Sequence, residues 1–230
     1  MSEKIDPTWA WAAYAPDARR PWDLRLAGHL FRRAGFGAGG KALERAVAEG
    51  PLQTVDRLLR PEGDAAGFNR TFDGFETASI DPAGGEMETL REWWLRRMIE
   101  TPHPLLEKMT LFWHHCFGAS GVRVGSARLI AAHVGLLREH ALGSLPAMLE
   151  AVSHDAALLI TLAGDANRKA LPAEGFARRL LGVFGFGPSE YTDRDVREVA
   201  RAFTGWFVIR NHLRYIEREH DPGVKRVLGE

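Results

Sequence analysis

Apolar residues recur every three or four positions along most of the chain, which is the spacing of amphipathic helices. Leu26 and Leu30 follow this spacing, and the Asp23 carboxylate can cap a helix that runs to about Ala34. Proline and glycine divide the rest of the pattern into segments. The predicted helices that follow span residues 41–49, 52–59, 87–100, 105–117 and 126–142, then a helix from 144, and residues 155–162, 172–184 and 193–206.

Two stretches depart from the helical pattern. Residues 61–85 are rich in Gly, Asp, Ala and Thr, which predicts a long irregular connection. After Trp206, two short β-type runs flank Asn211 and predict a β-hairpin. We therefore expect a mainly α fold: a multi-helix orthogonal bundle with one small β-hairpin near the C-terminus. It would form a single domain over residues 1–230, with residues 1–22 as an irregular N-terminal arm.

The charge balance and apolar content limit the classes of partner. The 30 basic residues match the 30 acidic ones, so no net field attracts nucleic acid, and no nucleic-acid partner is expected. No apolar run approaches the roughly 20 residues that span a bilayer, and the N-terminus lacks the features of a signal peptide. These features predict a cytoplasmic protein without a membrane partner. Cys116 is the only cysteine, which excludes an internal disulfide and any site built from several cysteines.

The spacing of glycines and lysine in residues 35–41 matches most of the pattern of phosphate-binding loops. Such loops follow a β-strand, whereas the segment before Gly35 has a helical pattern. Ala42 also stands where a Walker-type loop has the Ser or Thr that binds magnesium. We expect a glycine-terminated helix and a tight turn there, and neither a nucleotide nor haem as cofactor.

The stretch EKMTLFWHHCFGAS, residues 107–120, carries the first set of candidate functional residues. Glu107 and His114 are seven positions apart and share one helix face, and Cys116 follows closely, so these three are candidate metal ligands. A complete site would need ligands from another helix. His115 is a catalytic candidate as a partner of a thiolate. The alternatives are an inert cysteine and a polar cluster at a helix end.

Residues 164–179 carry the second set of candidates. Asn167, Arg168 and Lys169 are three consecutive donor-rich side chains that can bind a carboxylate or phosphate. Glu174 and Arg178 follow one helical turn apart and are catalytic candidates. The alternative for the latter two is an ordinary i,i+4 ion pair on a solvated face.

Six blocks of the sequence carry a family resemblance: residues 29–38, 93–117, 136–144, 167–172, 195–206 and 220–229. Taken in this order, they resemble a bacterial family known as domain of unknown function 1800. The resemblance implies a predominantly helical fold and no established reaction. It also implies a partner protein resembling sulfatases, because such proteins are often encoded next to family members.

The chain also departs from the family pattern at polar positions. Cys116 stands where a second histidine is usual. Ala173 and Gly175 stand where the family has asparagines, and Arg179 and Gly182 where it has glutamates. The resemblance therefore implies a site that has lost most of its polar groups.

These departures lead to two hypotheses for function. The first is an uncharacterised helical protein without an assignable reaction, a catalytically reduced scaffold or binding module. In this hypothesis the chain corresponds to the N-terminal half of the family and is a truncated copy. The rival is a metal-dependent, hydrolase-like enzyme in which Glu107, His114, Glu174 and Cys116 bind a divalent metal ion between helices.

Truncation would also expose apolar surface. Helices that cover Trp93, Trp94, Phe112 and Trp206 in a longer protein would be absent. Exposed apolar area favours association, so we expect a homo-oligomer.

Overall fold

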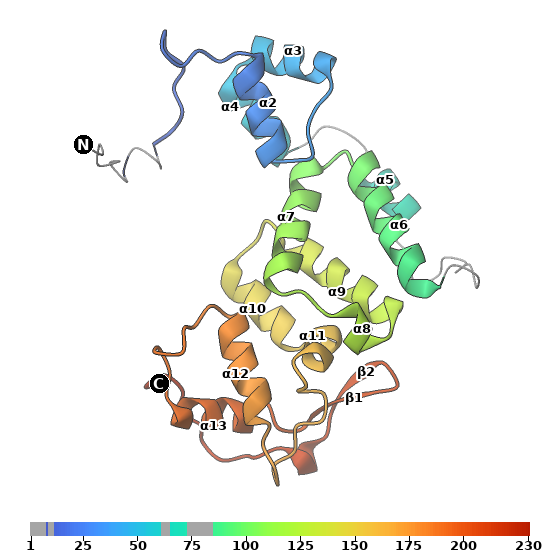
Figure 1. The fold of residues 1–230 in the computed structure, drawn as a ribbon, viewed down its shortest axis with the longest axis vertical. Helices are drawn as coiled ribbons and strands as arrows, with labels where there is room; N and C mark the ends of the chain where they lie inside the picture. Colours follow the sequence, from blue (N-terminus) through green and yellow to red (C-terminus); the bar gives the residue numbers. More distant parts are fainter. Residues whose placement is uncertain (1–7, 9–11, 61–64, 73–84) are drawn as a thin grey trace.

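The computed structural model describes residues 8, 12–60, 65–72 and 85–230, and these residues form a mainly helical fold (Figure 1). This confirms the predicted fold class, including the small hairpin near the C-terminus. The helices are α2 (Leu24–Arg33), α3 (Gly40–Glu49), α4 (Pro51–Leu59), α5 (Ala65–Phe72), α6 (Glu86–Glu100), α7 (Pro104–Cys116), α8 (Gly121–Val124), α9 (Ala127–His140), α10 (Leu145–Ser153), α11 (Ala156–Thr161), α12 (Glu174–Val183) and α13 (Asp193–Ala202), with a short 3₁₀ helix, η1 (Glu217–Glu219).

Helices α2, α3 and α4 form a three-helix unit at one end of the molecule (Figure 1). The Asp23 side chain accepts a hydrogen bond from Leu26 N, so the predicted cap is confirmed. Gly50 joins α3 to α4 with φ +84°, a conformation that favours glycine, and Pro51 begins α4. A small apolar core holds the unit together and consists of Ala27, Phe31, Ala46 and Leu58.

Helix α5 corrects the prediction of an irregular connection over residues 61–85. Residues 65–72 are helical, whereas residues 61–64 and 73–84 lie outside the described part of the chain. The helix is held by tertiary contacts that local composition does not encode. The Arg97 guanidinium lies 5.2 Å from the Phe68 ring centroid and 5.8 Å from that of Phe72. The Trp93 indole also donates to Phe72 O at 3.1 Å.

Helix α9 lies at the centre of the molecule and contacts α6, α7, α8, α10 and α11. The predicted Ser126 cap is confirmed, since its hydroxyl accepts from Leu129 N. An almost continuous set of buried side chains runs along α9 and includes Ile130, His133, Val134 and Leu137. This helix therefore positions residues that its neighbours contribute to the interior.

Helices α12 and α13 pack together in the C-terminal part, with Phe176, Leu180, Val196 and Ala200 in the shared core. Thr192 and Asp195 form a capping box at the start of α13. Helix α13 ends at Ala202, four positions before the predicted end, because Gly205 adopts φ +93° and the next residue begins a strand.

The predicted hairpin is confirmed and consists of β1 (Trp206–Ile209) and β2 (His212–Tyr215). The strands pair antiparallel, from Trp206 opposite Tyr215 to Ile209 opposite His212. Arg210 and Asn211 connect them with φ values of +50° and +63°. Two consecutive positive φ values are typical of a type I′ turn, for which asparagine is a favoured residue.

Candidate functional site

Helix α7 carries the first set of candidates, and its helical geometry divides them between two faces. Trp113 packs toward the main core and donates its indole N–H to Ala141 O at 3.0 Å. Glu107 and His114, two turns apart, face the interior beside α6 and α9. Cys116 and His115 are exposed. The face shared by Glu107 and His114 therefore excludes Cys116, which lies two positions beyond His114.

Glu107 is the centre of a buried ion-pair network. Its side chain is 1% exposed, and its Oε1 accepts from Arg97 Nε at 2.8 Å and from Arg138 Nε at 2.9 Å. Its Oε2 accepts from Arg138 Nη2 at 3.2 Å. Both carboxylate oxygens therefore accept hydrogen bonds from guanidinium groups, and the two positive charges would repel a metal cation. Glu107 joins α6, α7 and α9, which is a structural role.

His114 lies half-buried between two aromatic groups. Its ring centroid is 5.0 Å from that of Trp94 and 5.8 Å from that of His133. Burial, with smaller contributions from the nearby His133 and His115, lowers the pKa of His114 to about 4. His114 is therefore uncharged at neutral pH, with a ring nitrogen free to accept or bind.

His133 and Asp155 form a buried pair beside His114 that the sequence did not single out. His133 is 0% exposed, and its Nδ1 lies 2.9 Å from Asp155 Oδ1. The same Asp155 oxygen accepts from Leu158 N at 2.7 Å and so caps α11. His133 Nε2 is buried without a hydrogen-bond partner. The sequence contains one signal for this pair: His133 lies on the apolar face of a predicted helix, and a buried polar group there needs a hydrogen-bond partner.

Asn167, from the second set of candidates, has a structural role, because its hydrogen bonds connect separate segments of the chain. It is 0% exposed, and its Nδ2 donates to Ala200 O at 2.7 Å. Its Oδ1 accepts from Ala173 N at 2.9 Å, and its main-chain carbonyl accepts from Gly205 N at 2.8 Å. These bonds join the loop to the start of α12 and the end of α13, and they leave the amide with little capacity for a ligand.

The neighbouring candidates lie on the surface. Arg168 pairs with Glu219 at 3.5 Å and lies over the Phe207 ring, while the Lys169 side chain is exposed. Arg178 pairs with Asp193 at 2.8 Å. The i,i+4 pair considered for Glu174 and Arg178 is therefore replaced by a contact between α12 and α13. Glu174 is exposed at the first position of α12.

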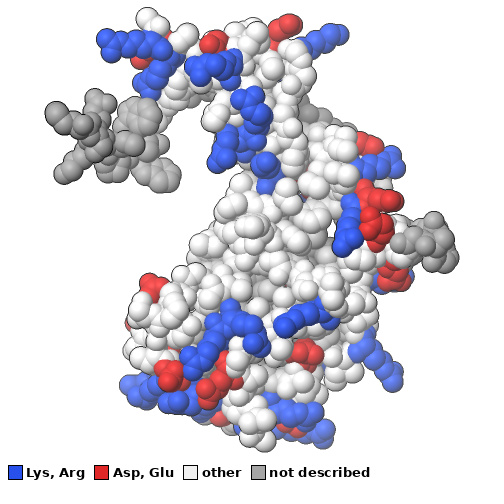
Figure 2. Space-filling view, in the orientation of Figure 1, with Lys and Arg blue, Asp and Glu red and all other residues white. Residues whose placement is uncertain are grey.

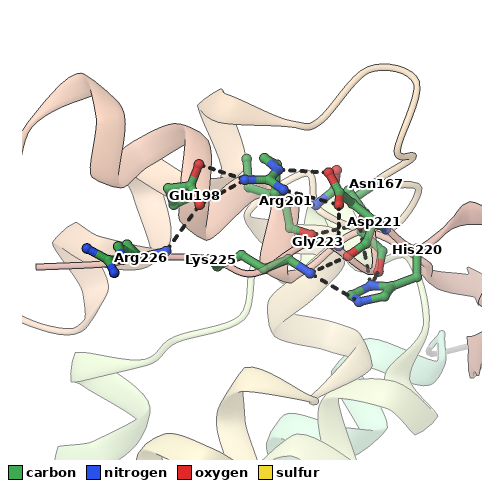
Figure 3. Close-up of polar contacts among 10 residues, drawn as sticks. Asn167, Glu198, Arg201, His220, Asp221, Gly223, Lys225 and Arg226 are labelled. Atoms are coloured by element: carbon green, nitrogen blue, oxygen red, sulfur yellow. Dashed lines mark hydrogen bonds and ion pairs between the residues drawn. The ribbon is translucent and has the colours of Figure 1, made fainter. Parts of the chain in front are cut away.

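Residues 220–226 form a strap that a polar network ties to α13 (Figure 3). Arg201 donates to Asp221 Oδ2 at 2.7 Å and to both oxygens of Glu198, at 2.8 and 2.9 Å. The Arg201 guanidinium holds the pKa of Asp221 well below its usual range. His220 Nδ1 donates to Thr204 O at 2.8 Å, and Lys225 Nζ donates to His220 Nε2 at 3.3 Å. The polar groups of this segment, which lies in the family block at residues 220–229, therefore hold it against α13.

An apolar groove of about 480 Å³ opens on the three-helix unit, between α2 and α4. Leu52 on its edge is 78% exposed. His29 and Arg33 contribute to the lining, and the other residues that line the groove are Ala13, Tyr14, Trp22, Leu26, Leu30, Pro51, Leu52 and Val55. Such a concave apolar surface is typical of ligand and peptide sites.

A basic stripe of Arg25, His29, Arg32 and Arg33 runs along α2 beside this groove. The spacing places all four on one helix face, and all four are exposed. Among the described residues the three arginines form no ion pair. Figure 2 shows Lys and Arg side chains over this end of the molecule.

The described residues contain neither a three-residue metal-binding cluster nor a membrane-spanning helix. No group of three His, Cys, Asp or Glu side chains there could hold a metal ion, so the candidate ligands Glu107, His114 and Cys116 do not gather into one site. In the same part of the chain, no helix is both long and apolar enough to cross a membrane.

Comparison with known proteins identifies the family. The family model described as "Protein of unknown function (DUF1800)" matches residues 29–230. No curated protein and no solved structure matches the chain. The match does not support the narrower expectation that the resemblance is to an N-terminal half. Because it covers most of the 230 residues, the chain belongs to the DUF1800 family of proteins of unknown function.

Proposed function

We propose that the chain is a helical binding module whose recognition surface is the apolar groove between α2 and α4. The groove carries this proposal, because it is concave and lined by apolar side chains. The catalytic candidates give less support for a reaction. Arg178 forms an ion pair between helices, and Glu174 and His115 are exposed on different helices, α12 and α7.

The occupant that fits this surface is an amphipathic helix with acidic residues along one side. Helices bind such grooves by inserting apolar side chains at i, i+3 or i+4 and i+7. Leu26, Leu30, Leu52 and Val55 supply the apolar counterpart. The basic stripe on α2 lies beside the groove, and its arginines are available to pair with carboxylates and fix the orientation of the bound helix.

The helix would come from another protein. The family resemblance implies a partner resembling sulfatases, so an acidic amphipathic helix of such a protein is the first candidate. The proposal assumes that both proteins meet in the cytoplasm.

The test uses a fluorescent synthetic helix of about 18 residues, long enough to be partly helical alone, with leucines on one face and glutamates beside them. Fluorescence anisotropy would measure its binding to the full chain. Of two control peptides, one has the same composition in scrambled order, and the other has lysine in place of each glutamate. We expect binding of the acidic helix alone; no binding, or equal binding of the lysine peptide, would overturn the proposal.

Matched variants locate the site. Leu52→Asp removes an exposed apolar side chain from the groove and should weaken binding about tenfold or more, since burying a leucine contributes roughly 1.5–3 kcal/mol. Val122→Asp changes a 96% exposed residue on α8, outside the groove, and should leave the affinity unchanged. Equal affinities in the two variants would exclude the groove as the binding site.

The rival, a metal-dependent hydrolase that uses Glu107, His114, Glu174 and Cys116, has weaker support. Two arginines occupy Glu107, and Cys116 and Glu174 are exposed on different helices. Of this set, only His114 has surroundings that favour ligand binding.

A further inference from the structure

The interior between α7, α9 and α11 contains a histidine nitrogen without a partner. His133 is completely buried, and its Nδ1 lies 2.9 Å from Asp155 Oδ1. A carboxylate accepts hydrogen bonds, so Nδ1 carries the proton. In the neutral ring, Nε2 then presents a lone pair, and this atom is buried without a partner. A buried polar atom left unsatisfied destabilises the fold, so a ligand at Nε2 would remove a destabilising feature.

His114 lies beside the His133 ring, and Trp94 lies beside His114. His114 supplies a second imidazole, with its ring centroid 5.8 Å from that of His133. The Trp94 ring centroid lies 5.0 Å from that of His114, and the Trp94 indole N–H is also buried without a hydrogen-bond partner. Three nitrogen-bearing rings from three helices therefore meet here, and two of them have an unpaired polar atom.

The His133–Asp155 contact has the form that orients histidine ligands of metal ions. Such a histidine binds the ion through one nitrogen and donates its other N–H to a carboxylate or carbonyl, which fixes the ring. Asp155 is itself held, because it accepts from Leu158 N.

We propose that His133 Nε2 and His114 together bind one divalent transition-metal ion of the zinc class, with Asp155 orienting His133. Imidazole nitrogens favour Zn²⁺, Co²⁺, Ni²⁺ and Cu²⁺ over Mg²⁺ or Ca²⁺. Water completes the coordination. The half-buried His114 provides the route of entry. Of the metal ligands predicted from the sequence, this set retains His114, and His133 takes the place of Glu107 and Cys116.

The site is separate from the groove between α2 and α4, so its test does not depend on the proposed binding function. A bound ion would link α7 to α9, and through Asp155 to α11. Because ligands that bind only the folded state stabilise it, metal should also raise the melting temperature of the chain.

The experiment uses the full chain, freed of any affinity tag, stripped with a chelator and dialysed. Cobalt(II) is added first, because its visible spectrum reports nitrogen coordination, and zinc is then measured by elemental analysis. We expect one equivalent of metal, a new absorption band and a higher melting temperature. A wild-type chain that retains no zinc and gives no cobalt band would overturn the proposal.

Three variants distinguish this site from incidental binding. His114→Gln and His133→Gln each remove one ligand while keeping a polar side chain of similar length, and both should abolish the cobalt band. His115→Gln changes the exposed neighbour and should bind like wild type. Circular dichroism and the melting temperature in chelator check that each variant folds. A folded His114→Gln or His133→Gln protein that binds cobalt like wild type would overturn the proposal, as would loss of binding in His115→Gln.

Discussion

Glu107 and Arg97 form an ion pair 2.8 Å long with almost no access to solvent, and Arg138 completes it from α9. Glu107→Gln would leave two guanidinium groups beside a neutral amide. Removing one member of a buried ion pair typically costs about 3–5 kcal/mol. We expect a loss of that size in the free energy of unfolding, measured with urea.

A matched control is Glu88→Gln, which breaks the exposed pair with Arg91 on α6. Exposed pairs contribute about 0–1 kcal/mol, so this variant should unfold almost like wild type. Similar losses in the two variants would contradict the structural role assigned to Glu107.

Asn167 should behave as a structural residue rather than an anion-binding one. Asn167→Ala leaves Ala200 O and Ala173 N without their side-chain partners in a buried region. Each buried group left unpaired costs about 1–3 kcal/mol, so unfolding should become easier by an amount in this range or above. Arg168→Ala, next to it on the surface, should have little effect. The Asn167 assignment fails if both variants melt at the wild-type temperature.

The capping box of α13 predicts a dependence of stability on pH. The Thr192 hydroxyl, the Thr192 backbone N–H and the Leu228 N–H lower the pKa of Asp195 to about 2, from an ordinary value of 3.8. Because the folded-state pKa is the lower one, this carboxylate stabilises the fold above about pH 4, and the contribution is lost as the pH falls toward 2. Asp195→Asn should therefore be less stable than wild type near pH 5, with the difference shrinking toward pH 2. Urea unfolding at several pH values would measure it, and a constant difference would contradict the prediction.

Local sequence signals predicted most of the fold. Asp23, Ser126 and Thr192 mark helix starts through side-chain caps, which act within three residues. Asn211 marks the hairpin because its turn requires a positive φ. Helix α5 was missed, since its phenylalanines are held by Arg97 from a helix that lies farther along the chain.

The candidate site was less predictable for the same reason. Spacing placed Glu107 and His114 on one helix face, as found. It could not indicate that Arg97 and Arg138 would neutralise the first, or that His133 would lie beside the second. The His133–Asp155 pair joins positions 22 residues apart, and only the packing of α9 against α11 brings them together.

The expected homo-oligomer remains a prediction, and the structure indicates where to test it. Trp93, Trp94 and Trp206 are partly buried, whereas Leu95 and Ile99 on α6 are 55% and 74% exposed. Both line a groove with Leu111 of α7. Exposed apolar surface favours association, so the mass from light scattering should rise with protein concentration. In the double variant Leu95→Lys and Ile99→Lys, the measured mass should stay that of a monomer at all concentrations. A wild-type chain that is monomeric at all concentrations would contradict this expectation.

Asp155 should affect metal binding more than stability, because its two roles can be separated. Asparagine caps helices about as well as aspartate, so Asp155→Asn should retain α11 and melt near the wild-type temperature in chelator. It removes the negative charge that orients and polarises His133, and loss of such a partner typically weakens metal binding about 10–100-fold. Ser126→Ala is the matched control, because it removes a cap from α9, the helix of His133, without touching the histidine pair. Cobalt titrations should show weaker binding in Asp155→Asn and wild-type affinity in Ser126→Ala. Equal affinities in wild type and Asp155→Asn would show that the carboxylate does not orient a metal ligand.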